Sequence, residues 1–522
     1  MNKFKNAIRM IIIVLLLSAT HRLTATDFSS TAATTQIPVE IVVDKIRGGL
    51  LGQILGNLNG IPHEMRYVAE PGNVLNYVPS LPDGARTDDD TDFEWIYVLE
   101  MQKSRNVFLS SNEITKFWKE RINRGIWCAN RYARYLMDIG LKPPFTGYVS
   151  INPWSDFNVA GQFLSETFGL IAPAMPQTAA KIGLNYTTVS IDGEPAQGTQ
   201  LFTTMISMAF VESDINKILD AGIASLDPSS KLLQVVNDVK MWYVEYPNNW
   251  KETRRLLKEK YTIEGGGMRD RNGIELNTGA IIAAMLYGRG DFAESLKLSF
   301  NLGWDADCNA ATVGTIVGTV YGYRRMMTQS KRNEPLWQIV DRYRNTTREN
   351  MPMNETITSF ADRIIELFEM LNEKNGGKKI VVDQKLVYEI SMENPAPVTQ
   401  FKPVDNQRQQ LRSELEQTII NDILNGDREA KARAAYLAVC IEMDKDLGKK
   451  YSRQWQDACF QLSGYWKIMA NIFQGDGANP FKNLAQMRDR FSAAGFKSPV
   501  VNIPERDIFE DKNVWRNPKE LY

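Results

Sequence analysis

Residues 48–60 read GGLLGQILGNLNG, with glycine at every fourth position from 48 to 60. A second run repeats this spacing with small residues at Ala310, Gly314, Gly318 and Gly322. Residues four apart share one face of a helix, and a face without side chains lets another backbone approach closely. Because each glycine costs up to about 1 kcal/mol of helix propensity relative to alanine, a compensating contact is expected. We therefore predict two closely packed helices at the centre of a helical bundle.

Helical patterns also dominate the sequence around these two runs. A transmembrane glycine zipper is excluded for the first run because polar residues interrupt it, at Arg47, Gln53, Asn57 and Asn59. From Ile41 onward, apolar residues recur at helical spacing, as they do at Phe360, Ile364, Leu367 and Leu371. The sequence therefore predicts an all-α fold.

The 522 residues are enough for more than one folding unit. We predict a signal peptide at 1–25, a Ser- and Thr-rich linker at 26–40, a helical domain at 41–375, a connector at 376–405 and a helical extension at 406–522. In the connector, residues 379–382 and 386–390 are typical of short strands, and prolines follow them. In the extension, one stripe at helical spacing is expected to be core: Trp455, Cys459, Leu462, Trp466, Met469 and Phe473.

The N-terminus has the order of a secretory signal. Lys3, Lys5 and Arg9 precede an apolar run at 10–17, and small residues follow. The run is too short to span a bilayer comfortably. We expect export to the periplasm or the extracellular space, with an uncleaved N-terminal anchor as the alternative.

The composition narrows the chemistry. The chain holds only two histidines, His21 and His63, which nearly excludes imidazole zinc sites and histidine-based triads. The formal net charge of −1 and the lack of a basic stripe give nucleic-acid binding little support. The four cysteines are widely scattered, so buried free thiols are expected. Reactions here would depend on carboxylates, hydroxyls and magnesium-like ions.

Two aspartate clusters lie far apart in the chain. Residues 88–92 read DDDTD, and residues 304–309 read WDADCN at the start of the second small-residue helix. Adjacent carboxylates repel one another, and a hard divalent cation between them relieves that repulsion. A helix N-terminus also favours carboxylates, so a solvated cap is the alternative for the first cluster. Together the clusters predict one shared metal site.

Four motifs in this order resemble the ADP-ribosylglycohydrolase family, of the dinitrogenase reductase activating glycohydrolase type. They are GIPHE at 60–64, DDDT at 88–91, VSIDGE at 189–194 and DADCNAA at 305–311. The resemblance covers about residues 41–370. It implies an orthogonal helical bundle with a cleft that holds two Mg²⁺ ions, and cleavage at the anomeric carbon of an ADP-ribosyl group. Mn²⁺ and Ca²⁺ are the alternative ions.

The resemblance also assigns site residues. The metal ligands it implies are Asp88, Asp89, Asp90, Asp305, Asp307 and Cys308. Asp88 and Cys308 stand where the family usually has threonine, and a thiol is a poor partner for Mg²⁺. The catalytic residues it implies are Asp305, Asp307 and Glu64. Asn57 stands where the family usually has aspartate, and Ile191 where it usually has histidine.

The chemistry of such a centre agrees with the resemblance. Two cations about 3.5–4 Å apart can hold the ribose hydroxyls and lower the pKa of a bridging water. Asp305 or Asp307 then accepts the proton, and the anomeric centre passes through an oxocarbenium-like state. Thr91 is interpreted as a helix cap or a support for the ligands.

The predicted function is an exported, metal-dependent hydrolase of an N- or O-glycosidic bond to ADP-ribose or a related ribosyl compound. Its partner would be a small-molecule or ADP-ribosylated substrate, with no nucleic acid and no stable membrane insertion after signal cleavage. The alternative is a catalytically inactive member that serves as an exported binding or scaffold protein. The sequence leaves the aglycone and the oligomeric state open.

Overall fold

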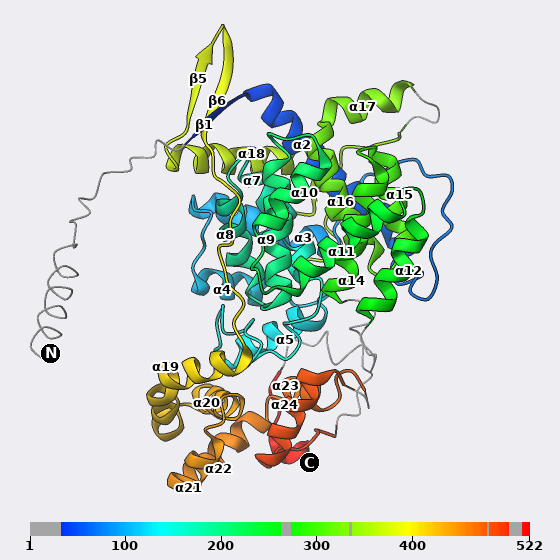
Figure 1. The fold of residues 1–522 in the computed structure, drawn as a ribbon. Coiled ribbons are helices and arrows are strands. Elements are labelled where there is room, and N and C mark those ends of the chain that lie inside the picture. The colour runs from blue at the N-terminus through cyan, green and yellow to red at the C-terminus, as the bar shows by residue number, and fades with distance from the viewer. Residues whose placement is uncertain (1–32, 263–272, 333–336, 478–479, 501–513, 522) are drawn as a thin grey trace, which may run out of the picture.

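The computed structural model describes residues 33–262, 273–332, 337–477, 480–500 and 514–521 (Figure 1). The predicted signal peptide at 1–25 lies outside the described residues. Helices make up most of the described chain, and the strands form two small three-stranded sheets. The all-α prediction is confirmed.

Helices α2 (Val39–Gly60) and α16 (Ala306–Tyr321) form the central pair and contact each other more extensively than any other two elements. A Cβ atom placed on Gly48 would lie 2.5 Å from the carbonyl oxygen of Gly318. Cβ atoms on Gly52 and Gly56 would collide with the backbone of Gly314 and Ala310. Close backbone contact therefore offsets the poor helix propensity of the glycines. Gly322 differs from expectation, because it follows α16 with a φ of 75° and ends the helix.

The other helices of the main body surround this pair (Figure 1). Their bounds are α3 Asp89–Ser104, α4 Ser111–Arg121, α5 Cys128–Leu136, α6 Ala160–Phe163, α7 Glu166–Ile171, α8 Pro176–Thr187, α9 Glu194–Met208, α10 Ile215–Ala224, α11 Lys231–Glu245, α12 Trp250–Tyr261, α14 Ile274–Gly288, α15 Phe292–Leu302, α17 Tyr323–Arg332 and α18 Ile357–Lys374. Short 3₁₀ turns, η1 (Ile61–His63) and η2 (Met137–Ile139), follow α2 and α5. None of the helices in the described part of the chain has the length and apolar character needed to cross a bilayer.

One sheet corrects the predicted linker. Strand β1 (Thr34–Pro38) pairs antiparallel with β6 (Lys385–Ser391), which pairs with β5 (Lys378–Val382). Part of the segment predicted as a linker at 26–40 is therefore a strand, and α2 starts at Val39. The strand forms because Ile37 is buried and its backbone is paired with Tyr388. The two strands predicted in the connector are found within one residue of their expected bounds.

The second sheet lies beside the first aspartate cluster. It has the order β2 (Ala85–Arg86), β3 (Tyr343–Arg344) and β4 (Asn354–Glu355). Strand β2 leads directly into the Asp88 cap of α3, and its parallel partner β3 comes from far along the chain. The sheet therefore fixes where the first cluster begins.

The C-terminal region is helical, with α19 Val404–Asn425, α20 Arg428–Cys440, α21 Asp444–Lys450, α22 Ser452–Ser463, α23 Trp466–Phe473, α24 Lys482–Ala493 and η3 Pro518–Glu520. The predicted aromatic stripe is mostly buried, but it is split between α22 and α23 at Gly464. The carbonyl of Gly464 accepts a hydrogen bond from Arg516 N, and Trp515 fills the space a side chain would need. Tyr436 of α20 is hydrogen-bonded to Tyr132 and to the Ile151 carbonyl, which attaches this region to the main body. The division into domains stays a prediction.

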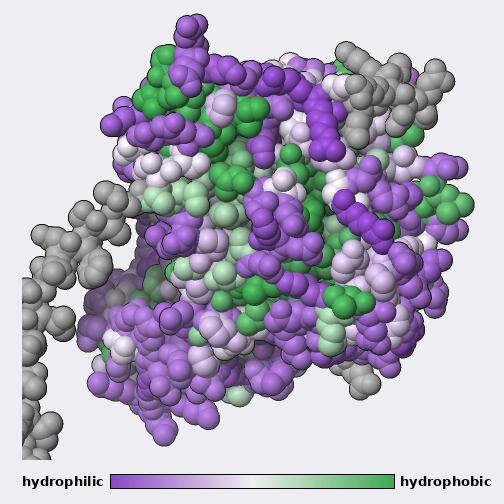
Figure 2. All heavy atoms as spheres, turned by 45° about the horizontal axis from the view of Figure 1, so that its top comes forward, coloured by the Kyte–Doolittle hydropathy of each residue, from purple (hydrophilic) through white to green (hydrophobic). Residues whose placement is uncertain are grey.

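Hydrophilic side chains cover most of the face shown in Figure 2, and hydrophobic ones form separate patches. Val381 and Leu386 of the β5–β6 hairpin are among the exposed apolar residues. All four cysteines are free, as predicted; three are buried, and Cys459 is partly exposed.

Candidate metal centre

The two aspartate clusters occupy the N-terminal ends of two helices. Asp88 is the N-cap residue of α3, and Asp89 and Asp90 lie in its first turn. Asp305 is the N-cap residue of α16, and Asp307 lies in its first turn. The unpaired N–H groups and the positive dipole end of each helix offset part of the negative charge gathered there.

Helix α2 contacts both aspartate clusters and fixes their relative position. At its last residue, Gly60, an added Cβ would lie 2.5 Å from the Cα of Asp307, so the bare helix face extends to the second cluster. One turn earlier, Asn57 Nδ2 donates to Asp88 Oδ2 at 3.0 Å and to Asp90 Oδ2 at 2.5 Å. The same helix therefore touches both clusters, which explains how segments more than two hundred residues apart converge.

The predicted ligands form three overlapping groups. The groups are Asp88, Asp89 and Asp90; Glu64, Asp305 and Asp307; and Asp90, Asp307 and Cys308. Within each group the candidate ligand atoms lie within 4.8 Å of one another. Asp90 and Asp307 each belong to two groups, so the structure brings together every residue that the sequence predicted for the site.

Burial and mutual repulsion make this cluster costly without a cation. Burial, and then the charge of Asp307, raise the pKa of Asp90 well above its usual range. Burial, and then Asp305, do the same for the pKa of Asp307. Glu64 lies at the solvent-facing edge, where partial burial of its carboxylate and then the charges of Asp305 and Asp88 raise its pKa to about 7. A bound cation would reverse these shifts by stabilising the ionised forms.

The site also contains buried oxygen atoms without a hydrogen-bond partner among the described residues. They are Asn57 Oδ1, Asp90 Oδ1 and Asp307 Oδ1. Leaving such an atom buried and unpaired is costly, and a coordinated cation is one way to satisfy it. Carboxylate and amide oxygens are the ligands that Mg²⁺, Mn²⁺ and Ca²⁺ prefer, so the donor set fits a hard divalent ion everywhere except at Cys308.

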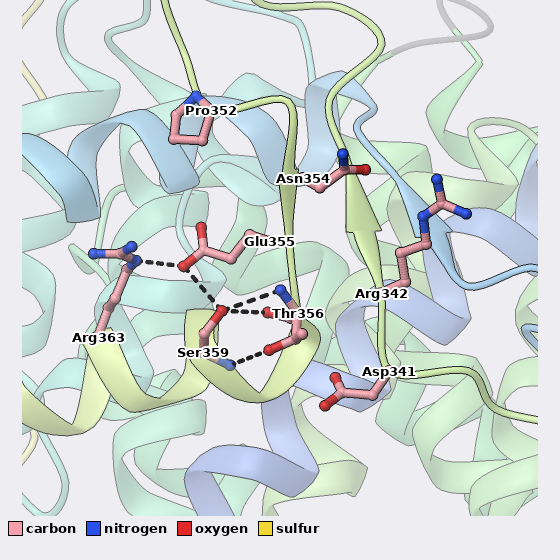
Figure 3. Close-up of a pocket in the computed structure, with 8 residues that line it drawn as sticks. All are labelled: Asp341, Arg342, Pro352, Asn354, Glu355, Thr356, Ser359 and Arg363. Atoms are coloured by element: carbon pink, nitrogen blue, oxygen red, sulfur yellow. Dashed lines mark hydrogen bonds and ion pairs between the residues drawn. The ribbon is translucent and has the colours of Figure 1, made fainter.

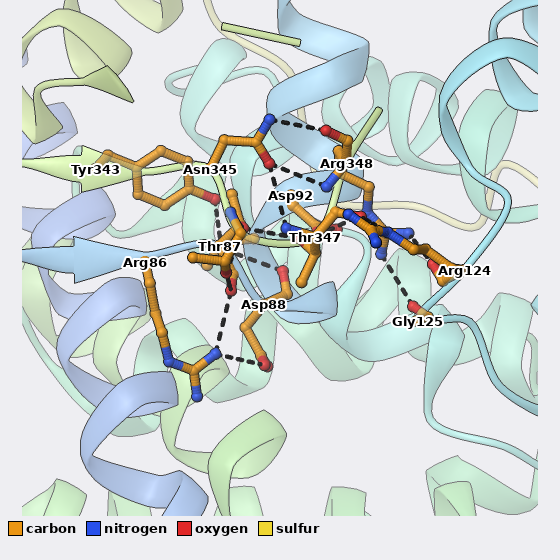
Figure 4. A network of polar contacts seen from close by, with 12 residues as sticks. Arg86, Thr87, Asp88, Asp92, Arg124, Gly125, Tyr343, Asn345, Thr347 and Arg348 are labelled. Atoms are coloured by element: carbon orange, nitrogen blue, oxygen red, sulfur yellow. Dashed lines mark hydrogen bonds and ion pairs between the residues drawn. The ribbon is translucent and has the colours of Figure 1, made fainter. Parts of the chain in front are cut away.

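The fourth aspartate of the first cluster has a different role (Figure 4). Asp92 Oδ2 lies 2.7 Å from Arg348 Nε, and both side chains are fully buried. Thr347 Oγ1 also donates to Asp92 Oδ2 at 2.5 Å, and Arg348 reaches the carbonyls of Arg124 and Gly125. The ion pair therefore anchors the first turn of α3. Sequence reasoning missed this ion pair, because the arginine lies outside every motif.

Four other motif residues are structural. Thr91 Oγ1 is hydrogen-bonded to the Tyr343 hydroxyl at 2.7 Å, so its side chain supports the β3 contact. Asp192 accepts a hydrogen bond from Gln407, and Glu194 accepts bonds at the start of α11. Ile191, which stands where the family usually has histidine, is buried in the core and offers no polar group.

Arg254 is a site-supporting residue that sequence reasoning missed. Glu64 precedes Met65, whose N–H donates to the Trp304 carbonyl at 2.8 Å, and both Met65 and Trp304 have positive φ angles. Arg254 donates to Leu302 O at 2.8 Å and to Tyr67 O at 2.7 Å. This buried arginine therefore joins the segment that carries Glu64 to the segment that carries Asp305.

A separate open hollow of about 660 Å³ lies between β4 and the start of α18 (Figure 3). Within it Ser359 and Arg363 are both hydrogen-bonded to Glu355. None of the predicted site residues lines this hollow. The acidic centre and the hollow are therefore distinct features.

Comparison with known proteins gives one family. The family described as ADP-ribosylglycohydrolase matches residues 38–373, well over half of the chain. No curated protein matches. Among solved structures, a chain titled "ADP-ribosylglycohydrolase-related protein complex" is 16% identical, with a TM-score of 0.42, over 64% of this chain and 99% of that chain.

Proposed function

The chain belongs to the ADP-ribosylglycohydrolase family, and on that premise we propose that it is a metal-dependent hydrolase of an N- or O-glycosidic bond to ADP-ribose or a related ribosyl compound. The observation that carries the proposal is the convergence of six acidic side chains from α3, α16 and the segment after η1. Two of these side chains, Asp90 and Asp307, each have a buried oxygen atom that lacks a hydrogen-bond partner among the described residues, which supports a bound cation.

Asp88, Asp89, Asp90, Asp305 and Asp307 would hold the metal, with Mg²⁺ as the first choice and Mn²⁺ or Ca²⁺ as alternatives. When bound, such ions supply positive charge that orients hydroxyl oxygens and lowers the pKa of a water. Asn57 holds Asp88 and Asp90 by donating to both carboxylates. The chain thereby presents preorganised oxygen atoms, so little reorganisation is needed on binding.

The acid–base residues are assigned from their surroundings. Glu64 is the carboxylate of its group that solvent reaches, so it can exchange a proton with water. Asp305 and Asp307 lie deeper and are the proposed bases. Their negative charge also favours the positive character that develops at the anomeric carbon.

Location and partners are part of the same proposal. The charged and then apolar order of residues 3–17 supports export, with an uncleaved anchor as the alternative. The proposed partner is a small-molecule or ADP-ribosylated substrate whose ribose hydroxyls bound cations would hold, and the near-zero net charge of the chain does not favour nucleic acid.

The test uses the full chain, freed of metal by a chelator. It is assayed against ADP-ribosyl-arginine, ADP-ribosyl-serine and simple nucleosides, with and without added Mg²⁺. We expect metal-dependent hydrolysis that is lost in Asp305→Asn and retained in Asp383→Asn, a matched change in the exposed turn of the β5–β6 hairpin. In calorimetry, Mg²⁺ uptake that is absent, or unchanged in Asp305→Asn, would instead favour a scaffold protein.

A further inference from the structure

The group formed by Asp90, Asp307 and Cys308 differs chemically from the other two groups of the centre. Its third ligand is a thiol, whereas the groups around Asp88 and Glu64 offer oxygen alone. All three side chains are more than nine-tenths buried. One of the three ligand groups therefore contains sulfur, and the other two contain oxygen ligands alone.

We propose that the Asp90–Asp307–Cys308 group binds a thiophilic divalent cation of the Zn²⁺ class, while the all-oxygen groups take a hard ion. This inference rests on the proposed metal-dependent function and assigns the ion class of one part of the centre. Thiolate ligands select Zn²⁺ and its soft relatives, whereas Mg²⁺ takes oxygen ligands almost exclusively.

The geometry of the three side chains suits such an ion. The two carboxylate oxygens and the sulfur lie within 4.8 Å of one another. Zinc bonds of about 2.3 Å to sulfur and 2.0–2.2 Å to carboxylate oxygen place neighbouring ligands at somewhat less than this spacing. Small side-chain rotations would therefore bring all three atoms onto one ion.

Two further atoms point to a ligand here. Asp90 Oδ1 and Asp307 Oδ1 are buried and have no hydrogen-bond partner among the described residues. Asp90 uses its other oxygen to accept from Asn57, so Oδ1 is the atom left for a cation. A water molecule would then occupy the fourth coordination position of the ion, as in open zinc sites with three protein ligands.

Binding involves a simple proton balance. The thiol of Cys308 loses its proton to solvent as the sulfur–metal bond forms, and the ion keeps its oxidation state. Asp90 and Asp307 bind as carboxylates, and any proton that either one carries is released to solvent in the same way. Three anionic ligands around one divalent ion then leave a local charge of −1.

The experiment titrates the metal-free full chain with Cd²⁺, which reports a sulfur bond by an ultraviolet charge-transfer band. We expect one such band in the wild type, its loss in Cys308→Ser, and no change in Cys440→Ser, a matched buried free thiol of α20. Since loss of a group that only supports a ligand lowers metal affinity about 10- to 100-fold, Cys308→Ser should weaken Cd²⁺ binding by at least about 100-fold.

Several outcomes decide the proposal. A band that persists in Cys308→Ser, or a wild type without a band, overturns it. Cys308→Thr provides a second variant if the serine variant fails to fold, and thermal melting identifies that case.

Mn²⁺ binding, measured by calorimetry in the same variants, separates this proposal from the proposed metal-dependent function. Retained Mn²⁺ binding without a Cd²⁺ band rejects the soft site alone, whereas loss of both rejects the metal centre as a whole.

Discussion

The guanidinium of Arg254 stacks on the indole of Trp304, with its central carbon 4.6 Å from the ring centroid, one residue before Asp305. Trp304 has a φ of 56°, which is strained for a bulky side chain. Strain of this kind persists only where surrounding contacts over-determine it. Arg254 supplies those contacts through four backbone carbonyls, at Tyr67, Val68, Glu70 and Leu302.

Replacing Arg254 by lysine should weaken both the fold and the metal centre. Lysine keeps the charge but cannot reach four carbonyls with a planar fork. We expect the free energy of unfolding to fall by roughly 2–4 kcal/mol, because hydrogen bonds of charged groups contribute about 1.5–3 kcal/mol each and only some are lost. Urea unfolding measures the first effect, and calorimetric Mg²⁺ binding measures the second.

The neighbouring residue provides the control. Arg255 is exposed, and its ion pairs within the described part of the chain are with Glu252 and Glu259 on its own helix. Arg255→Lys should change the free energy of unfolding by less than about 0.5 kcal/mol and leave Mg²⁺ affinity unaltered. Equal effects of the two substitutions would remove Arg254 from the support of the site.

The glycine contact between α2 and α16 makes the next prediction. Gly52→Ala should lower the free energy of unfolding by about 3 kcal/mol, the upper end of the usual cost of overpacking, because the added methyl group would overlap the Gly314 backbone and neither helix can move without disturbing the clusters. Gly448→Ala in α21 is the control. Its methyl group would have 3.4 Å of space, so a neutral effect or a gain of up to about 1 kcal/mol is expected. Chemical denaturation of both variants provides the measurement.

The glycine contact and Arg254 show what the sequence could and could not predict. Glycine spacing identified the central helix pair because a helix face without side chains is explained by close contact with another backbone. The acidic clusters identified the site because adjacent carboxylates are costly unless they share a cation. Arg254 and Arg348 escaped notice because their partners are backbone carbonyls and a carboxylate fixed by tertiary contacts. Similarly, Thr34–Pro38 looked like a linker because its partner strand lies some 350 residues away.

A buried carboxylate on α3 should make stability depend on pH. Glu94 is fully buried beside Gln53 and Thr167, and burial raises its pKa to about 7 despite their hydrogen bonds. The unfolded chain ionises at about 4.3, so folding favours the protonated form. This contribution is complete below pH 4.3 and is lost as the pH rises to about 7. It amounts to about 4 kcal/mol in total.

Urea unfolding at pH 5.5 and pH 8, in chelator, tests this sign. The wild type should lose more stability than Glu94→Gln over this interval, because glutamine does not titrate. Other carboxylates of the metal-free centre titrate in both proteins, so the difference between the two slopes reports Glu94 together with Glu166, whose pKa the charge of Glu94 raises. Parallel slopes would show that Glu94 has a similar pKa in the folded and unfolded chain.

Asn57 offers a test of the link between charge and metal. Its amide donates to Asp88 and Asp90, so Asn57→Asp replaces a donor with an additional carboxylate beside these two. Without metal we expect a loss of roughly 2–4 kcal/mol, since a buried hydrogen bond becomes a repulsive contact. With saturating Mg²⁺ the added charge should strengthen binding, so much of this loss should be recovered. The melting temperatures measured in chelator and in Mg²⁺ would therefore differ more for the variant than for the wild type. Equal differences in the two proteins would show that Asn57 lies too far from the ion to affect its binding.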